Sequence, residues 1–190
     1  MKNLSTVLVL LVIAVGSSQA AAAQTFDFTH TQFIDKFNAQ LRRDGGDTTK
    51  TCKNIGRDTT CIFNDSRFQQ SVAEFKKLNL TNGGFTLKEK LIISETNGKV
   101  SLIIIEGDRA EPINLFHFVG QLGSSLSTLN PSLIADGMTK EILSLGVMRG
   151  DDDPNIGQSK MDILDSVEVK CNNQRSGVTT KIGCALVPRS

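Results

Sequence analysis

The segment FTLKEKLIISETNGKVSLIIIE, residues 85–106, decides the expected fold. It contains two runs that are typical of strands, Phe85 to Ser94 and Lys99 to Glu106. The pair Asn97-Gly98 between them is a strong signal for a two-residue type I′ hairpin turn. The segment therefore predicts an antiparallel β-hairpin.

The register of this hairpin follows from the position of its turn. Centring the turn on Asn97-Gly98 places Ile93 opposite Leu102 and Leu91 opposite Ile104. The same register places Ile92 opposite Ile103 on the other face. Because both faces carry apolar pairs, we expect the hairpin to lie centrally in a sheet.

A first helix is predicted from about His30 to Arg43. Thr29 and Gln32 have the spacing of a capping box, and Phe28 and Phe33 occupy the positions of a hydrophobic staple. Gly45-Gly46 ends the helical pattern.

Two further helices are predicted on either side of Asn130-Pro131. The first begins near Glu111-Pro112, and its apolar stripe is accompanied by a stripe of small residues that would let another element approach closely. The second contains Gly137, which is expected to interrupt it, and ends at Gly146. The small residues are Gly120, Ser124 and Ser127. Residues 67–80 fit either a short helix or an irregular strand. The expected architecture is α+β, an antiparallel sheet with helices packed on one face.

The first 23 residues have the layout of a secretory signal peptide. Lys2 precedes a short apolar run from Leu4 to Val15, and small residues follow up to Ala23. Twelve helical residues rise about 18 Å, too little to cross a hydrocarbon core about 30 Å thick. We therefore expect a signal peptide over 1–23, a single α+β domain over 24–190, and a periplasmic or secreted location without a transmembrane anchor after cleavage.

Composition limits the classes of partner. The chain has 21 Lys and Arg against 20 Asp and Glu, and loss of Lys2 with the signal peptide would leave 20 of each sign. Nucleic-acid binding requires a basic excess, so no nucleic acid is expected. With ten Phe but no Trp and no Tyr, the chain also offers no indole or phenol for stacking.

The chain has four cysteines, Cys52, Cys61, Cys171 and Cys184. An even number in an exported chain favours two disulfides, which allow three pairings. Turn-forming residues lie midway between Cys52 and Cys61, and strand-like runs flank an expected turn over 172–177 between Cys171 and Cys184. The pairing Cys52–Cys61 and Cys171–Cys184, each across a hairpin, is therefore predicted. The alternative of a four-cysteine zinc site is disfavoured because neither pair has the short spacing of structural zinc.

Catalytic signals are weak. Neither His30 nor His117 lies near the signature of a serine or cysteine nucleophile, and His117 is expected to be an ordinary helix residue. Glu106-Gly107-Asp108-Arg109 ends a strong strand and could serve acid–base chemistry, but a turn with an Asp–Arg surface pair is the preferred interpretation.

One loop has the oxygen spacing of a calcium site. Asp151, Asp153, Asn155 and Asp162 fall at positions 1, 3, 5 and 12 of a twelve-residue loop. Position 6, where an EF-hand requires glycine, is Ile156, so no metal site is predicted there. No cofactor is predicted either.

Four short motifs resemble those of a bacterial family. They are Phe33-x-x-x-Phe37-Asn38, Asn97-Gly98-Lys99-Val100, Gly107-Asp108-Arg109 and Asn130-Pro131-Ser132-Leu133. Together they are similar to small exported bacterial proteins of unknown function with an F-x-x-x-F-N first helix and a central N-P between two helices. The resemblance covers about residues 28–145, and it implies no catalytic residue.

These observations predict a non-catalytic exported domain that binds another macromolecule, such as an envelope or secreted protein, in the manner of an inhibitor, immunity factor or adaptor. The alternatives are a small carboxylate-dependent hydrolase and a small-molecule or calcium binder. A pocket with two facing carboxylates would favour the hydrolase, whereas a flat or grooved apolar patch would favour the binding domain.

Overall fold

A computed structural model shows how most of the chain beyond the predicted signal peptide is arranged. It describes residues 24–79, 85–109, 112–132, 135–149, 160–164, 166–176 and 179–189. Residues 1–23 and the loop positions Asp151, Asp153 and Asn155 lie outside the described residues.

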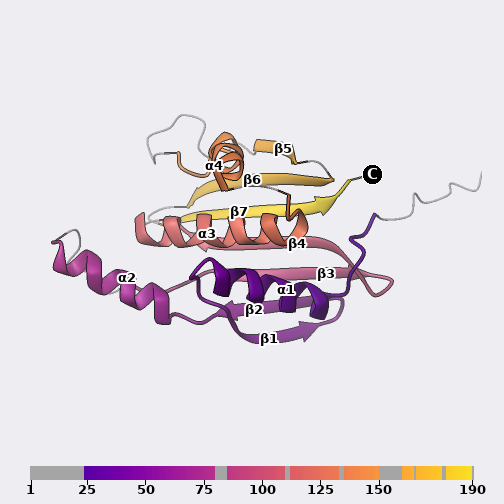
Figure 1. Cartoon of the computed structure of the whole chain (residues 1–190), viewed down its shortest axis with the longest axis horizontal. Coiled ribbons are helices and arrows are strands. Elements are labelled where there is room, and N and C mark those ends of the chain that lie inside the picture. The colour runs from indigo at the N-terminus through magenta and orange to yellow at the C-terminus, as the bar shows by residue number, and fades with distance from the viewer. Residues whose placement is uncertain are drawn as a thin grey trace, which may run out of the picture.

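In the part of the chain that the structure describes, seven strands form one sheet in which every pair of neighbours is antiparallel. Their order across the sheet is β1-β2-β3-β4-β7-β6-β5, so β4 is the middle strand (Figure 1). The strands are β1 (Thr49–Ile55), β2 (Asp58–Phe63), β3 (Lys90–Thr96), β4 (Lys99–Asp108), β5 (Lys160–Leu164), β6 (Val167–Ser176) and β7 (Thr179–Pro188).

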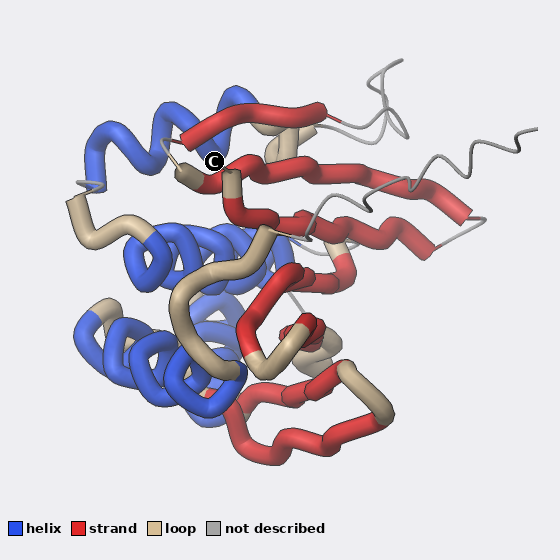
Figure 2. The backbone as a smooth tube through the Cα atoms, turned by 90° about the vertical axis from the view of Figure 1, so that its right-hand side faces the viewer, coloured by secondary structure: helices blue, strands red, loops and turns tan. Residues whose placement is uncertain are grey.

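The described residues form four helices beside the sheet: α1 (His30–Arg43), α2 (Ser66–Lys77), α3 (Pro112–Leu129) and α4 (Ala135–Ser144). Helices α1, α3 and α4 lie on one face of the sheet, and α2 projects beyond its end (Figures 1 and 2). The predicted α+β architecture, with helices packed on one face, is therefore confirmed.

Helix α1 begins and ends as its sequence predicts. The Thr29 side chain accepts a hydrogen bond from the Gln32 amide, and the Gln32 side chain accepts one from the Thr29 amide. The rings of Phe28 and Phe33 stack with centroids 5.7 Å apart, which is the expected hydrophobic staple. A Glu95 oxygen from β3 accepts a hydrogen bond from the His30 amide at 2.7 Å and thereby fastens the start of the helix to the sheet.

The central hairpin is present, but the predicted register is wrong by one residue beyond its turn. Thr96 pairs with Lys99 around Asn97-Gly98, and the register then shifts between Ser94 and Glu95. A β-bulge adds one residue to one strand of a pair, and here Ser101 has no Cα partner. Consequently Ile93 pairs with Ile103, Leu91 with Ile105, and Ile92 with Ile104.

The core lies between the sheet and the helices. Alternate residues of β3, β4 and β7 are fully buried against α1 and α3. The largest fully buried side chains of this core, from strands and helices together, are Phe33, Phe37, Leu41, Leu91, Ile93, Ile103, Ile105, Phe118, Leu122, Leu126 and Ile182. Burial of a large aliphatic or aromatic side chain contributes about 1.5–3 kcal/mol, so this layer dominates the stability of the fold.

In the helical regions one open alternative is resolved, and two details differ from expectation. Residues 66–77 are helical, which resolves the ambiguous segment. Gly137 lies inside α4 and does not interrupt it. Gly120 has open space where a side chain would be, whereas Ser124 donates a 2.6 Å hydrogen bond to Asp44 at the end of α1.

Both predicted disulfides are present. Cys52 pairs with Cys61 across β1 and β2, and Cys171 pairs with Cys184 across β6 and β7. The second hairpin is longer than predicted, because residues 172–176 continue β6 instead of forming the turn. The two disulfides fit an oxidising, extracytoplasmic compartment. None of the described helices is long and apolar enough to cross a membrane.

Candidate functional site

The face of the sheet turned away from α1, α3 and α4 is here called the open face, and no described helix packs on it (Figure 2). Strand side chains alternate between the two faces, so the neighbours of the buried core residues belong to the open face. Ile92 and Ile104 are cross-strand partners there, and Ala185 continues their row on β7. With Leu102 and Val187, they form the apolar centre of the open face, and all five are only partly buried.

A row of mostly polar residues runs beside the apolar centre. It passes from Ile62 on β2 through Lys90, Glu106 and Gly183 to Asn172 on β6. A cavity of about 530 Å³, here called the lysine cavity, opens along this row. Its lining consists of Lys88, Lys90, Glu106, Gly107, Asp108, Asn172, Lys181, Ile182 and Gly183.

Two glycines line the lysine cavity for different reasons. A Cβ atom at Gly107 would lie 2.9 Å from the Phe118 ring, so packing against α3 requires that glycine. At Gly183 the nearest atom to an added Cβ would be the Ile105 carbonyl oxygen, 3.8 Å away. Neither close packing nor a positive φ therefore explains Gly183. Its missing side chain leaves the hollow between Glu106 and Asn172.

The buried carboxylate of the lysine cavity is neutralised by one of its lysines. Lys88 Nζ lies 2.8 Å from Asp108 Oδ2, and the Asp108 side chain is only 8% exposed. The hydrogen bond to Asp108 raises the pKa of Lys88, so this lysine stays protonated near neutral pH. The Asp–Arg surface pair expected at this strand end is wrong, because Asp108 and Arg109 are both buried.

Glu89 is a buried carboxyl that no sequence motif marks. It is 3% exposed, its Oε2 accepts a hydrogen bond from the Lys88 amide, and its Oε1 has no partner among the described residues. Burial, with a smaller contribution from the charge of Asp108, raises the pKa of Glu89 to about 7. Glu89 lines a smaller cavity of about 200 Å³ together with Lys50 and Phe63.

Two carboxylates, Glu106 and Asp108, line the lysine cavity, but Asp108 is paired with Lys88. Glu89, whose pKa is raised, lines the other cavity. General acid–base catalysis needs a proton donor and a proton acceptor within reach of the same substrate. The carboxyl with the raised pKa is therefore separated from the two carboxylates of the lysine cavity.

His117 belongs to a structural network. Asp47 accepts hydrogen bonds from Ser66 Oγ and from the amides of Arg67 and Phe68, and it thereby caps the start of α2. His117 Nε2 lies 3.4 Å from the same carboxylate. Burial lowers the pKa of His117, which favours the neutral ring. Because Asp47 stands between Ser66 and His117, the histidine cannot take a proton from the serine as a nucleophile's base must.

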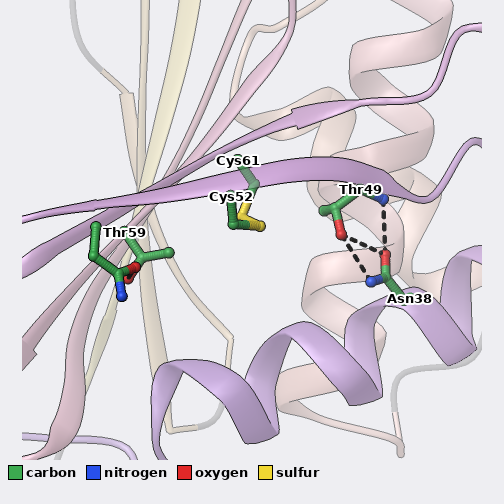
Figure 3. Close-up of a disulfide and its surroundings, with 6 residues drawn as sticks. Asn38, Thr49, Cys52, Thr59 and Cys61 are labelled. Carbon is green, nitrogen blue, oxygen red and sulfur yellow. Dashed lines mark hydrogen bonds between the residues drawn. A yellow bond between two sulfur atoms is a disulfide. The ribbon is translucent and has the colours of Figure 1, made fainter.

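The disulfide Cys52–Cys61 lies at the edge of the sheet and close to α1 (Figure 3). Asn38 on α1 fixes the start of β1 there, since its amide group donates to Thr49 Oγ1 at 2.8 Å and its Oδ1 accepts from the Thr49 amide at 2.9 Å. These contacts give Asn38, part of the F-x-x-x-F-N motif, a structural role.

Metal binding has no support from the part of the chain that the structure describes. No group of three His, Cys, Asp or Glu side chains gathers there in a way that could hold a metal ion. Of the four predicted loop positions, Asp162 alone falls in a described element, β5.

The lysine cavity and the open face could not be located from sequence motifs, because they depend on which strands become neighbours. The apolar residues on both faces of residues 90–106 were the one available signal, and they were interpreted as a sign of a central strand. The chain matches no family model, no curated protein and no solved structure at a significant level.

Proposed function

We propose that the mature domain is a non-catalytic exported binding domain that docks an envelope or secreted protein on its open face. The observation that supports this proposal is the apolar centre on a face that no described helix covers. Antiparallel sheets with one solvated face usually alternate apolar residues inside with polar residues outside. Here Ile92, Leu102 and Ile104 are apolar on the outside.

The surroundings of the apolar centre fit a protein-docking surface. Lys90, Lys170 and Glu106 are exposed neighbours of the central row. An apolar patch with a polar rim is typical of interaction sites, and the rim adds specificity more than affinity. Ile62, on β2, extends the apolar surface and is 47% exposed.

A co-purification experiment with matched variants tests the proposal. Mature protein and three variants, Ile62→Glu, Ile92→Glu and Leu143→Glu, are immobilised and exposed to envelope extract and culture medium of the producing cell. Leu143 is 54% exposed on α4, so Leu143→Glu introduces the same charge at similar exposure on the helical side.

We expect a protein that is retained by wild type and Leu143→Glu but reduced at least tenfold with both open-face variants. Far-UV circular dichroism and thermal unfolding verify that each variant is folded. The same set of retained proteins with all four baits, or none with wild type, would refute the proposal.

A further inference from the structure

The lysine cavity is built around a missing side chain. Gly183 lies in the middle of β7, where glycine is unfavourable by about 0.5–1 kcal/mol relative to alanine. Its neighbours across the sheet are Glu106 on β4 and Asn172 on β6. Neither packing nor a positive φ requires glycine at position 183. The effect of the missing side chain is therefore the open space above Gly183.

The charged groups of the cavity have a positive excess. Three lysines, Lys88, Lys90 and Lys181, line it together with two carboxylates, Glu106 and Asp108. The ion pair between Lys88 and Asp108 neutralises one charge of each sign. The remaining two lysines and one glutamate leave a net charge of +1, which favours an anionic group in the cavity.

Asn172 adds an unmet hydrogen-bond requirement. Its Oδ1 atom is buried and has no hydrogen-bond partner among the described residues, although the residue lines the cavity. A buried acceptor without a donor costs about 1–3 kcal/mol, so a ligand that brings an N–H group to this position would be favoured. A peptide presents such N–H groups beside its side chains, whereas an isolated carboxylate offers none.

We propose that the lysine cavity receives an acidic peptide segment of the docked partner, with a carboxylate side chain near Lys90 and Lys181 and a neighbouring peptide N–H directed at Asn172. This inference rests on the proposed function, because the cavity borders the apolar centre of the same face. The row Lys90, Glu106 and Gly183 lies directly beside the row Ile92, Ile104 and Ala185. One partner could therefore contact the apolar centre and place an acidic segment in the cavity.

The test is a titration of isotope-labelled mature protein with defined peptides, followed through the backbone amide resonances of Asn172 and Gly183 or its replacement. The probes are acetylated and amidated tetraglutamate, the matching tetraglutamine peptide, and free glutarate. The key variant is Gly183→Leu, which fills the hollow while improving strand propensity. Gly120→Leu is the control, since Gly120 on α3 also has open space where a side chain would be but lies outside the cavity lining.

We expect saturable shifts with tetraglutamate, at least tenfold weaker binding of tetraglutamine and of glutarate, and at least tenfold weaker tetraglutamate binding by Gly183→Leu. Gly120→Leu should stay within twofold of wild type. The inference is overturned if tetraglutamate gives no saturable shift, if the neutral peptide or glutarate binds as well, or if Gly183→Leu binds like wild type.

Failure of this inference is distinguishable from failure of the proposed function. If co-purification depends on Ile62 and Ile92 but the titration fails, the docking face stands and the acidic segment is excluded. If the titration succeeds and co-purification is indifferent to Ile62 and Ile92, the cavity binds acidic peptides and the docking proposal fails alone.

Discussion

The two disulfide hairpins share one local design and have different surroundings. In β1–β2, Cys61 is buried but Cys52 is exposed, and β1 is exposed along almost its whole length at the edge of the sheet. In β6–β7, Cys171 and Cys184 are both buried, and β7 lies between β4 and β6. The same covalent link therefore fastens an edge strand in one hairpin and reinforces the core in the other.

The two hairpins are also anchored by different forces. Side-chain hydrogen bonds hold the start of the first, through Asn38 with Thr49 and through Asp47 with α2. Apolar burial holds the second, whose side chains Val169, Ile182 and Leu186 are 0–2% exposed. We infer that the first hairpin can open locally, whereas the second opens only when the domain unfolds.

The largest difference between the two hairpins is expected in the unfolding free energy that is lost when each disulfide is removed. The chain-entropy model assigns almost equal stabilisation, about 3 kcal/mol, to loops with sequence separations of 9 and 13. Burial adds a packing loss at both Cys171 and Cys184, whereas in the first hairpin it adds one at Cys61 and none at the exposed Cys52. We expect the double variant Cys171→Ala/Cys184→Ala to lose about 4 kcal/mol of unfolding free energy, and Cys52→Ala/Cys61→Ala about 2–3 kcal/mol.

Urea unfolding of the two variants and the wild type measures these losses. Similar m-values would show that the denatured states are comparable. Equal losses for the two variants would contradict the idea that burial, and not loop length, separates the hairpins.

Asp47 tests the polar anchoring of the first hairpin. Asp47→Ala removes the acceptor of the Ser66 hydroxyl and of the Arg67 and Phe68 amides, and it leaves buried donors without a partner. We expect a loss of about 3 kcal/mol in unfolding free energy and faster hydrogen exchange at the start of α2.

Asp65→Ala is the matched control for Asp47→Ala. Asp65 occupies the N-cap position of α2, but its side chain makes no capping hydrogen bond. It should change the unfolding free energy by less than about 0.5 kcal/mol. A larger loss from Asp65→Ala than from Asp47→Ala would show that the distant carboxylate does not cap the helix.

The sequence was informative where structure is decided locally. The capping box at Thr29 and Gln32, the turn at Asn97-Gly98 and the pairing of the cysteines depend on residues close in the chain, and all are present. The bulge at Ser101 was not predictable, because its hydroxyl bonds to Thr96 and Ser94 on the facing strand and no pattern within β4 marks it.

The candidate site depends on contacts between distant segments. Gly183 leaves a hollow only because β7 pairs with both β4 and β6, and a single glycine in a strand does not reveal which neighbours it will have. The cap of α2 by Asp47 and the burial of Glu89 were missed for the same reason. Each depends on a contact that forms only after the strands and helices assemble.

Glu89 offers a pH-dependent test of the surroundings of the first hairpin, because it lines a cavity together with Lys50 of β1 and Phe63 of β2. Burial raises the pKa of Glu89 from 4.5 to about 7, so the folded protein binds more protons than the unfolded chain between these values. Stability from this group is therefore complete below pH about 4.5 and is lost as the pH rises to about 7. Glu89→Gln removes the titration and keeps the shape of the side chain.

We expect Glu89→Gln to be more stable than wild type by about 2 kcal/mol at pH 8, and to be close to wild type at pH 4. Urea unfolding from pH 4 to pH 8 measures the difference. The charged groups around the Glu89 carboxyl are those of Lys50, Asp65, Lys88, Lys90 and Asp108. Parallel stability curves for the two proteins would contradict a raised pKa.

The smallest expected losses of stability come from two asparagine variants, whose hydrogen exchange distinguishes local opening of a hairpin from global unfolding. Asn38→Ala removes the side-chain bonds to Thr49, and Asn173→Ala removes a 2.7 Å hydrogen bond from β6 to the Gly146 carbonyl oxygen. Each variant should lose about 1 kcal/mol of unfolding free energy, as one or two neutral hydrogen bonds contribute.

In Asn38→Ala, hydrogen exchange at Thr49 should accelerate more than the global unfolding free energy predicts, because an exposed edge strand separates from the sheet without exposing much core. In Asn173→Ala, the amides of β6 and β7 should accelerate only as far as the global loss requires. Asn38→Asp, which keeps the acceptor for the Thr49 amide, should fall between Asn38→Ala and wild type. If the amides of the second hairpin also exchange faster than global unfolding allows, the two hairpins open in the same way and burial does not set their difference.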